Sequence, residues 1–186
     1  MYIKGMKNCR LCELCKTRMH VLKGEGDPRA GIMLIAHAPG EQEDRENRMF
    51  IGPSGKILDM LLEEAGISRS RIYITNLLKC RLSKNRRPKL KEIAACSIWL
   101  EAEIKRVKPA LIAPLGYYAT KYMFETHGLG TFIREVYLGL IGVLCPAPDF
   151  ALFPLTHPTI LIHNQEYIPA SVKNFKSLKD YVAQRM

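Results

Sequence analysis

The chain has 186 residues, and its 28 Lys and Arg against 18 Asp and Glu give a formal net charge of +10 at pH 7. This length suits one domain, and we expect a single domain over residues 1–186 that includes an N-terminal cysteine segment at about 1–30. The charge favours a polyanion such as nucleic acid as partner. An apolar content of 47% excludes a disordered chain. The sequence has neither a signal peptide nor an apolar run of the roughly 20 residues that a membrane span needs, so we expect an intracellular, cytoplasmic protein without a membrane partner.

Apolar runs and helical periodicities alternate along the chain. They predict strands at 31–36, 71–76, 110–116, 136–145 and 150–156, and helices at 55–65, 90–107, 117–124 and 169–185. Ser54 is expected to cap the first helix and Gly66 to end it. This alternation predicts an α/β fold of three layers, α/β/α, around a central, mostly parallel four-stranded sheet.

The segments that follow the predicted strands are the natural place for a ligand site. The stretch 37–53 is broken by Gly and Pro and predicts no regular element. This stretch and the segments 76–87, 116–117 and 157–164 each follow the end of a predicted strand. Since ligands bind beyond the carboxyl ends of parallel strands, we expect these segments to converge on one crevice.

Six cysteines lie at Cys9, Cys12, Cys15, Cys80, Cys96 and Cys145. Without a secretory signal a disulfide framework is not expected. The first three form two overlapping C-x2-C pairs, a spacing that is typical of metal and iron–sulfur ligation. The residues alone leave zinc, an iron–sulfur cluster and free buried thiols open.

Two segments suggest anion binding. The sequence GPSGK at 52–56 lacks the first Gly and the final Ser or Thr of a phosphate-binding P-loop, which argues against a nucleotide triphosphatase. It leaves a helix N-terminus at Ser54 and Gly55 that suits a single phosphate. The run at 79–91 holds seven Lys and Arg, Lys84, Arg86 and Arg87 among them, between two cysteines. It predicts a cationic surface for salt-sensitive binding to DNA.

The segment 156–164 brings a histidine and apolar residues to the mouth of the predicted crevice. His157 follows a predicted strand and precedes Pro158. Ile160 and Leu161 come next and are expected to be exposed. Apolar wedges beside a catalytic group are used by enzymes that hold a duplex open for a flipped base.

Taken in order, these pieces resemble the uracil-DNA glycosylase superfamily, most closely its iron–sulfur family 4. The resemblance rests on CRLC at 9–12, APGEQED at 38–44, RMFIGPSGKILD at 48–59, YITNLLKCR at 73–81, NRRP at 85–88, PALIAPLG at 109–116 and HPT at 157–159. It runs over nearly the whole chain. It implies a DNA repair glycosylase that flips uracil out of DNA and hydrolyses its N-glycosidic bond, leaving an abasic site.

The resemblance also implies roles for individual residues. A structural four-iron four-sulfur cluster would be held by Cys9, Cys12, Cys80 and Cys96, with zinc as the alternative metal and Cys15 as a spare thiol. Asn76 would pair with O4 and N3–H of uracil, Phe50 would stack on the base, and His157 would donate to O2. The remaining pocket residues would be Ala38, Pro39, Gly40, Glu41 and Glu43, the last excluding the thymine methyl group. Ser54 and Gly55 would hold a flanking phosphate.

One motif departs from the family pattern. Family 4 has GEGPGE where this chain has AHAPGE at 36–41, so His37 replaces the acidic residue associated with the attacking water. A second departure is Asn47, where a Gly normally precedes the Arg-x-Phe. The APG and RMF sequences are similar to family 5, which accepts other deaminated bases. His37 is therefore predicted as a general base, a direct ligand of substrate or the mark of a weakened enzyme.

The alternatives to a uracil-specific enzyme follow from these departures. One is a glycosylase of broader specificity for hypoxanthine or xanthine. Another is a DNA-damage-binding protein with weak or no hydrolysis, and a third is a zinc-stabilised nucleic-acid module without a pocket. In each case the expected partner is DNA. If the protein is an enzyme, this DNA contains uracil or another deaminated base. We expect the protein to be a monomer.

Overall fold

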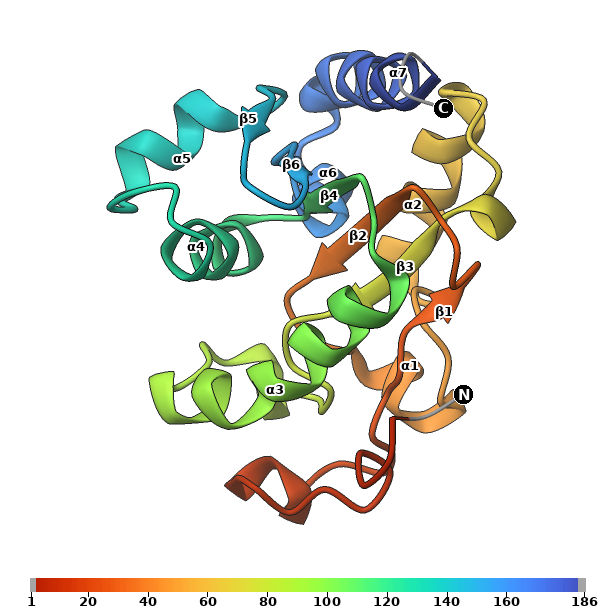
Figure 1. Ribbon diagram of the computed structural model, residues 1–186. Helices are drawn as coiled ribbons and strands as arrows, with labels where there is room; N and C mark the ends of the chain where they lie inside the picture. The colour runs from red at the N-terminus through yellow and green to blue at the C-terminus, as the bar shows by residue number, and fades with distance from the viewer. Residues whose placement is uncertain (1–2, 184–186) are drawn as a thin grey trace.

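The computed structural model of the chain describes residues 3–183, and its centre is a six-stranded sheet in the order β1-β3-β2-β4-β6-β5 (Figure 1). The four inner strands are parallel: β2 (Ile32–Ala36), β3 (Tyr73–Asn76), β4 (Leu111–Pro114) and β6 (Ala151–Leu152). Two antiparallel strands of two residues each form the edges, β1 (Glu25–Gly26) and β5 (Cys145–Pro146). The predicted α/β fold with a parallel four-stranded sheet is confirmed, and the two edge strands are additions that the sequence patterns did not indicate.

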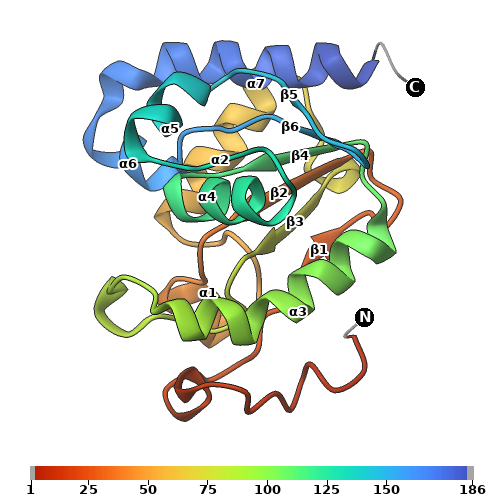
Figure 2. The ribbon, with the colours of Figure 1, turned by 60° about the vertical axis from the view of Figure 1, so that its left-hand side comes forward.

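Helices cover both faces of the sheet (Figures 1 and 2). One face packs against α2 (Pro53–Glu64), α6 (Pro158–His163) and α7 (Ile168–Ala183). The other packs against α3 (Leu90–Val107), α4 (Tyr117–Thr126) and α5 (Arg134–Leu140). Alternate residues of β2 join the two apolar clusters, Leu34 on one side and Ile35 on the other. All five residues of β2 are buried, as expected for a strand that is covered on both faces.

Three local predictions were wrong. The segment 136–145, predicted as a strand, contains most of α5, a turn and the first residue of β5, and Tyr137 is its only fully buried residue. The segments 37–53 and 157–164 contain the short helices α1 (Glu41–Glu46) and α6. Ser54 is not the cap of α2, because this helix begins two residues earlier than predicted, with Gly52 at the N-cap and Pro53 in the first turn.

The N-terminal segment lies alongside α3 (Figures 1 and 2). It contains the short 3-10 helix η1 (Glu13–Lys16) and contributes to a third apolar cluster with the segment after β3. That cluster includes Met6, Leu14, Val21, Leu78, Leu82, Cys80 and Cys96. Three more 3-10 helices are η2 (Arg69–Arg71), η3 (Ser83–Asn85) and η4 (Gln165–Tyr167). Within residues 3–183, no helix is long and apolar enough to cross a membrane.

Candidate active site

A small pocket lies beyond the carboxyl ends of the parallel strands. β2 leads into the 37–40 loop, β3 ends at Asn76, and the chain after β6 continues beside β4 to His157. This is the edge at which ligands bind in open α/β sheets. The lining consists of Ala38, Pro39, Gly40, Glu43, Phe50, Ser54, Asn76 and His157, all of which the sequence predicted. The predicted pocket residue Glu41 has its exposed carboxylate elsewhere, 2.7 Å from Nη2 of Arg81.

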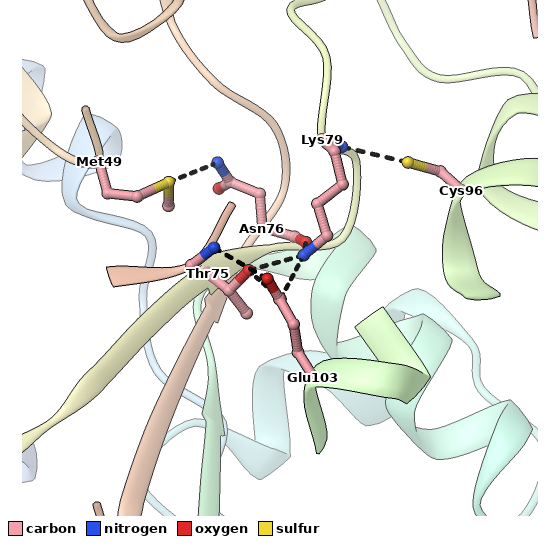
Figure 3. A network of polar contacts seen from close by, with 7 residues as sticks. Met49, Thr75, Asn76, Lys79, Cys96 and Glu103 are labelled. Carbon is pink, nitrogen blue, oxygen red and sulfur yellow. Dashed lines mark hydrogen bonds and ion pairs between the residues drawn. The ribbon is translucent and has the colours of Figure 1, made fainter. Parts of the chain in front are cut away.

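Asn76 offers its side-chain amide to this pocket. It is the last residue of β3, pairs with Ala36 of β2 and is 3% exposed. The only partner recorded for its Nδ2 within the described residues is Sδ of Met49, at 3.5 Å (Figure 3). A thioether sulfur is a weak acceptor, so the amide keeps its capacity for a stronger partner.

The Phe50 segment is held by charged side chains on both sides. Phe50 has φ +51°, a left-handed conformation that costs a non-glycine residue about 1–3 kcal/mol. Arg69 donates from Nη2 to the carbonyl of Met49 (2.5 Å) and from Nη1 to that of Phe50 (3.3 Å). On the other side, Oε1 of Glu43 accepts the backbone N–H groups of Ile51 at 2.9 Å and Gly52 at 2.8 Å. These contacts fix the ring of Phe50 at the pocket.

His157 is held as a neutral imidazole. It is the N-cap of α6, and its Nδ1 accepts the backbone N–H of Thr159 at 3.1 Å. Burial lowers the pKa of His157 to about 4, with a smaller contribution from nearby His37. Since Nδ1 accepts, the proton of the neutral ring is on Nε2. Gly116, with φ +84°, leaves room for this ring, because a Cβ at that position would lie 2.9 Å from Cβ of His157.

His37 lies next to this site but is not part of the pocket lining. Its ring stacks on Tyr118, with centroids 4.6 Å apart. Its Nε2 is buried and has no hydrogen-bond partner within the described residues. Burial lowers the pKa of His37 to about 4, so the ring is uncharged at pH 7 and is a weaker base than an ordinary histidine.

The N-terminus of α2 is close to the same pocket. Pro53 has no N–H, and the N–H groups of Gly55 and Lys56 donate to the carbonyl of Gly52. Ser54 lines the pocket, whereas Gly55 is buried against the carbonyl group of Phe50. The capacity of this terminus to bind a phosphate therefore centres on Ser54.

The four cysteines that were predicted as ligands come from the N-terminal segment, the loop after β3 and helix α3. Cys80 and Cys96 are buried, and Cys9 and Cys12 are partly buried. Burial raises the pKa of Cys80 to about 12 and that of Cys96 to about 11, and neighbouring cysteines, Cys12 among them, add to both rises. Cys80 and Cys96 belong to one apolar cluster, and Cys12 packs against it. Cys145 lies partly buried in the edge strand β5.

Three N–H donors surround these sulfur atoms. The backbone N–H of Lys79 donates to Sγ of Cys96 at 3.2 Å, and the indole N–H of Trp99 donates to Sγ of Cys9 at 3.3 Å. Nη1 of Arg18 lies 3.4 Å from Sγ of Cys80. Such donors stabilise the thiolate form of cysteine and are typical partners of metal-bound sulfur.

The basic segment differs from the prediction in one residue. Lys84 and Arg87 are exposed, and Arg86 forms a two-pronged ion pair with the buried carboxylate of Glu92. Lys79, expected on the same cationic surface, is 1% exposed. The expectation was wrong for Lys79 because its ammonium group pairs with buried Glu103 at 2.6 Å.

The two predicted wedge residues, Ile160 and Leu161, differ in their exposure to solvent. Ile160 is 42% exposed, whereas Leu161 is fully buried in the core beneath α6. The prediction that Leu161 is exposed was wrong because 157–164 forms a helix, which turns consecutive residues to different sides.

Comparison with known proteins gives the family of this chain. A model of the uracil-DNA glycosylase superfamily matches residues 23–184. The chain belongs to this superfamily. The type-4 uracil-DNA glycosylase of Sulfurisphaera tokodaii is 35% identical over 93% of this chain and 80% of its own length, and that of Saccharolobus solfataricus is 34% identical over 97% and 84%. A type-5 enzyme of Thermus thermophilus is 31% identical over 69% and 73%.

Several contacts in this uracil-DNA glycosylase superfamily member come from residues that no motif indicated. Arg69 holds the carbonyl groups beside the Phe50 ring, and Tyr118 stacks on His37. Arg18 and Trp99 donate to the cysteine sulfur atoms. Each of these residues is distant in sequence from the group that it contacts, and Arg69 is nineteen residues from Phe50. No local spacing in the sequence could have identified them.

Proposed function

We propose that this protein is a monofunctional uracil-DNA glycosylase that flips uracil out of DNA and hydrolyses its N-glycosidic bond. The observation that carries the proposal is the convergence of the Asn76 amide, the Phe50 ring and the His157 imidazole on one pocket. The type-4 names of the similar proteins support uracil as the base. The pocket lining contains no lysine, so the abasic product is not expected to be cleaved.

Base recognition is assigned to Asn76 and Phe50. The amide of Asn76 donates to O4 and accepts from N3–H of uracil, whereas cytosine presents the opposite pattern and leaves these groups unpaired. Phe50 stacks on the flipped ring. Exclusion of the thymine methyl group is assigned to Glu43, whose carboxylate lines the pocket and accepts the backbone N–H groups of Ile51 and Gly52.

His157 is assigned to the leaving group. As the glycosidic bond breaks, negative charge develops on O2 of uracil while the sugar becomes oxocarbenium-like. The neutral imidazole donates its Nε2–H to that oxygen, and the Thr159 N–H on Nδ1 holds the required tautomer. A donor aligned in advance stabilises this charge without rearrangement, and removing such a donor typically costs about 10²–10³-fold in rate.

We assign the attacking water to the neighbourhood of His37. Its buried, unpartnered Nε2 provides a polar atom close to His157. With a pKa of about 4 the ring orients water by hydrogen bonding rather than by removing a full proton at pH 7. In this role His37 would replace the acidic residue of the family 4 motif by a neutral hydrogen-bonding group.

DNA binding is assigned to the surface around the pocket. Ser54, at the start of α2, holds a phosphate beside the flipped nucleotide, whereas Gly55, predicted for the same role, is buried with its N–H bonded to Gly52. Lys84 and Arg87 neutralise further phosphates, while Arg86 shapes the same loop through Glu92. Exposed Ile160 is the wedge candidate that the structure leaves at the surface.

We propose a four-iron four-sulfur cluster on Cys9, Cys12, Cys80 and Cys96. A zinc ion needs its ligands at about 2.0–2.3 Å from one point. Within residues 3–183, no group of three or more His, Cys, Asp or Glu side chains is arranged to hold a single ion. A cluster spaces its thiolates more widely, and the three N–H donors on sulfur suit it. When bound, it supplies cross-links between the N-terminal segment, the basic loop and α3.

The proposal is tested on oligonucleotides that carry uracil or hypoxanthine, single- and double-stranded, with alkaline cleavage of the abasic product. We expect release of uracil and loss of that activity in Asn76→Ala. Release of hypoxanthine at a similar rate would establish the broader specificity that the resemblance of the first motif to family 5 implies. Binding without release of any base would contradict the enzyme assignment and support a damage-binding protein.

A further inference from the structure

A buried ion pair lies directly beneath the base-recognising residue. The Nζ atom of Lys79 is 2.6 Å from Oε2 of Glu103, 2.6 Å from Oγ1 of Thr75 and 2.7 Å from the carbonyl oxygen of Asn76 (Figure 3). The side chains of both charged residues are almost fully buried, at 1% and 3% exposure. An ammonium group has three N–H donors, and all three have acceptors here.

The carboxylate of Glu103 is equally well satisfied. Its Oε1 accepts the backbone N–H of Gly24 at 2.8 Å, and its Oε2 accepts the hydroxyl of Thr75. Glu103 comes from α3, Gly24 from the segment before β1, and Thr75 from β3. The network therefore connects the end of β3 to the helix that also carries Cys96.

Stability alone does not account for such a pair. Removing two charges from water costs several kcal/mol per ion, and apolar residues of similar volume often serve as well or better. What the pair provides is position. Lys79 turns back to the carbonyl group three residues before it, and its own backbone N–H donates to Sγ of Cys96. The main chain that carries Asn76 is thus held between the ion pair and the cysteine centre.

We propose that Lys79 and Glu103 are positioning residues, which fix the main chain of Asn76 so that its amide meets the flipped base in one orientation. This inference rests on the proposed function, since it assigns the selectivity of the same pocket. Recognition by paired hydrogen bonds tolerates errors of only about 0.5 Å. Loss of the Lys79 contact leaves the carbonyl of Asn76 without this donor and releases the end of β3.

The test is the double variant Lys79→Met with Glu103→Gln. It removes both charges together, retains a side-chain acceptor for Gly24, and leaves the backbone N–H on Cys96 unchanged. The matched control is Lys121→Met with Glu125→Gln, which removes a pair of opposite charges at i and i+4 on the exposed side of α4. Iron content, visible absorption and the melting temperature are measured on both.

Selectivity is the readout that a merely structural role would not move. It is measured as the ratio of affinities for oligonucleotides that carry non-hydrolysable 2′-fluoro-deoxyuridine or thymidine, and as kcat/KM for uracil. We expect the double variant to keep its iron and fold, to lose about 10²-fold in kcat/KM and to lose most of its preference for uracil. The control is expected to match the wild type.

A folded double variant with wild-type preference and kcat/KM would overturn the inference. Should the double variant fail to fold, Thr75→Val removes only the hydroxyl that bridges the pair, and an unchanged preference for uracil in that variant would likewise overturn it. Failure of the proposed function is a different result, because the wild type itself would then release no base and show no preference for the uracil analogue.

Discussion

Replacing Gly55 by Ala tests whether the Phe50 segment is a rigid side of the pocket. Helix propensity alone predicts that the change stabilises the protein by roughly 0.5–1 kcal/mol, since Ala favours the helix over Gly. The structure predicts the opposite. A Cβ at position 55 would lie 2.0 Å from the carbonyl oxygen of Phe50 and 2.3 Å from its carbonyl carbon, where ordinary contact begins at 3.4 Å. The obstacle is backbone, which cannot rotate away as a side chain does.

The size of the effect follows from what holds Phe50. Arg69 and Glu43 fix the segment on both sides, so the added methyl group forces either those hydrogen bonds or the start of α2 to shift. Forcing an extra methylene into a packed site costs roughly 1–3 kcal/mol. A displacement of about 1 Å at a positioning residue costs about 10²-fold in activity. We expect Gly55→Ala to lower both the melting temperature and kcat/KM on that scale.

The assay is release of uracil from a single-stranded oligonucleotide, measured as kcat/KM, together with urea unfolding. Gly139→Ala is the matched control, because it lies within helix α5 and a Cβ there meets nothing within 4 Å. The control should keep full activity and gain the small stabilisation that helix propensity gives. If Gly55→Ala is more stable than the wild type and equally active, the close contact with Phe50 does not position the base.

Other parts of the site give three shorter predictions. Asn76→Ala should lower kcat/KM for uracil by about 10²-fold or more in the same assay, with the melting temperature little changed; full activity would exclude Asn76 as the recognition residue. In the folded protein the pKa values of His157 and His37 are about 4, below the ordinary 6.5. The unfolded state therefore binds more protons between about pH 4 and 6.5, and urea titrations should show unfolding free energy falling as pH falls through that window, whereas a flat profile would contradict the buried neutral rings. Cys96→Ser should lose iron and visible absorption together, while Cys15→Ser should keep both; equal loss in the two variants would contradict the assigned ligand set.

Local sequence patterns were sufficient for the main elements of the fold. The helix predicted at 90–107 is α3 with the same bounds, and Gly66 follows α2 with φ +63°, the conformation expected where a helix ends. The four inner strands were found because strands covered on both faces are continuous apolar runs. Parallel strands also place their carboxyl ends at one edge, which is why the 37–40 loop, Asn76 and His157 could be expected together.

The same patterns misled where burial depends on a distant partner. Lys79 belongs to a run of basic residues in the sequence, yet it points inward because Glu103 of α3 supplies its counter-charge. Leu161 follows an exposed isoleucine, yet the turn of α6 places it in the core. A local sequence pattern gives the types of residues present, but it does not give the tertiary contacts that decide whether each residue is buried.

The sequence by itself determined the four inner strands, the longer helices α2, α3, α4 and α7, the family and the residues that line the pocket, because each of these follows from local periodicity, from strand ends or from ordered motifs. Only the tertiary structure decided how those residues are held. Arg69 fixes the backbone of Phe50, and burial keeps the histidine rings neutral. The carbonyl group of Asn76 accepts a hydrogen bond from Lys79 of the buried Lys79–Glu103 pair. These features arise from contacts between segments far apart in the chain, where the dielectric environment and hydrogen-bond partners are set by packing rather than by neighbouring residues.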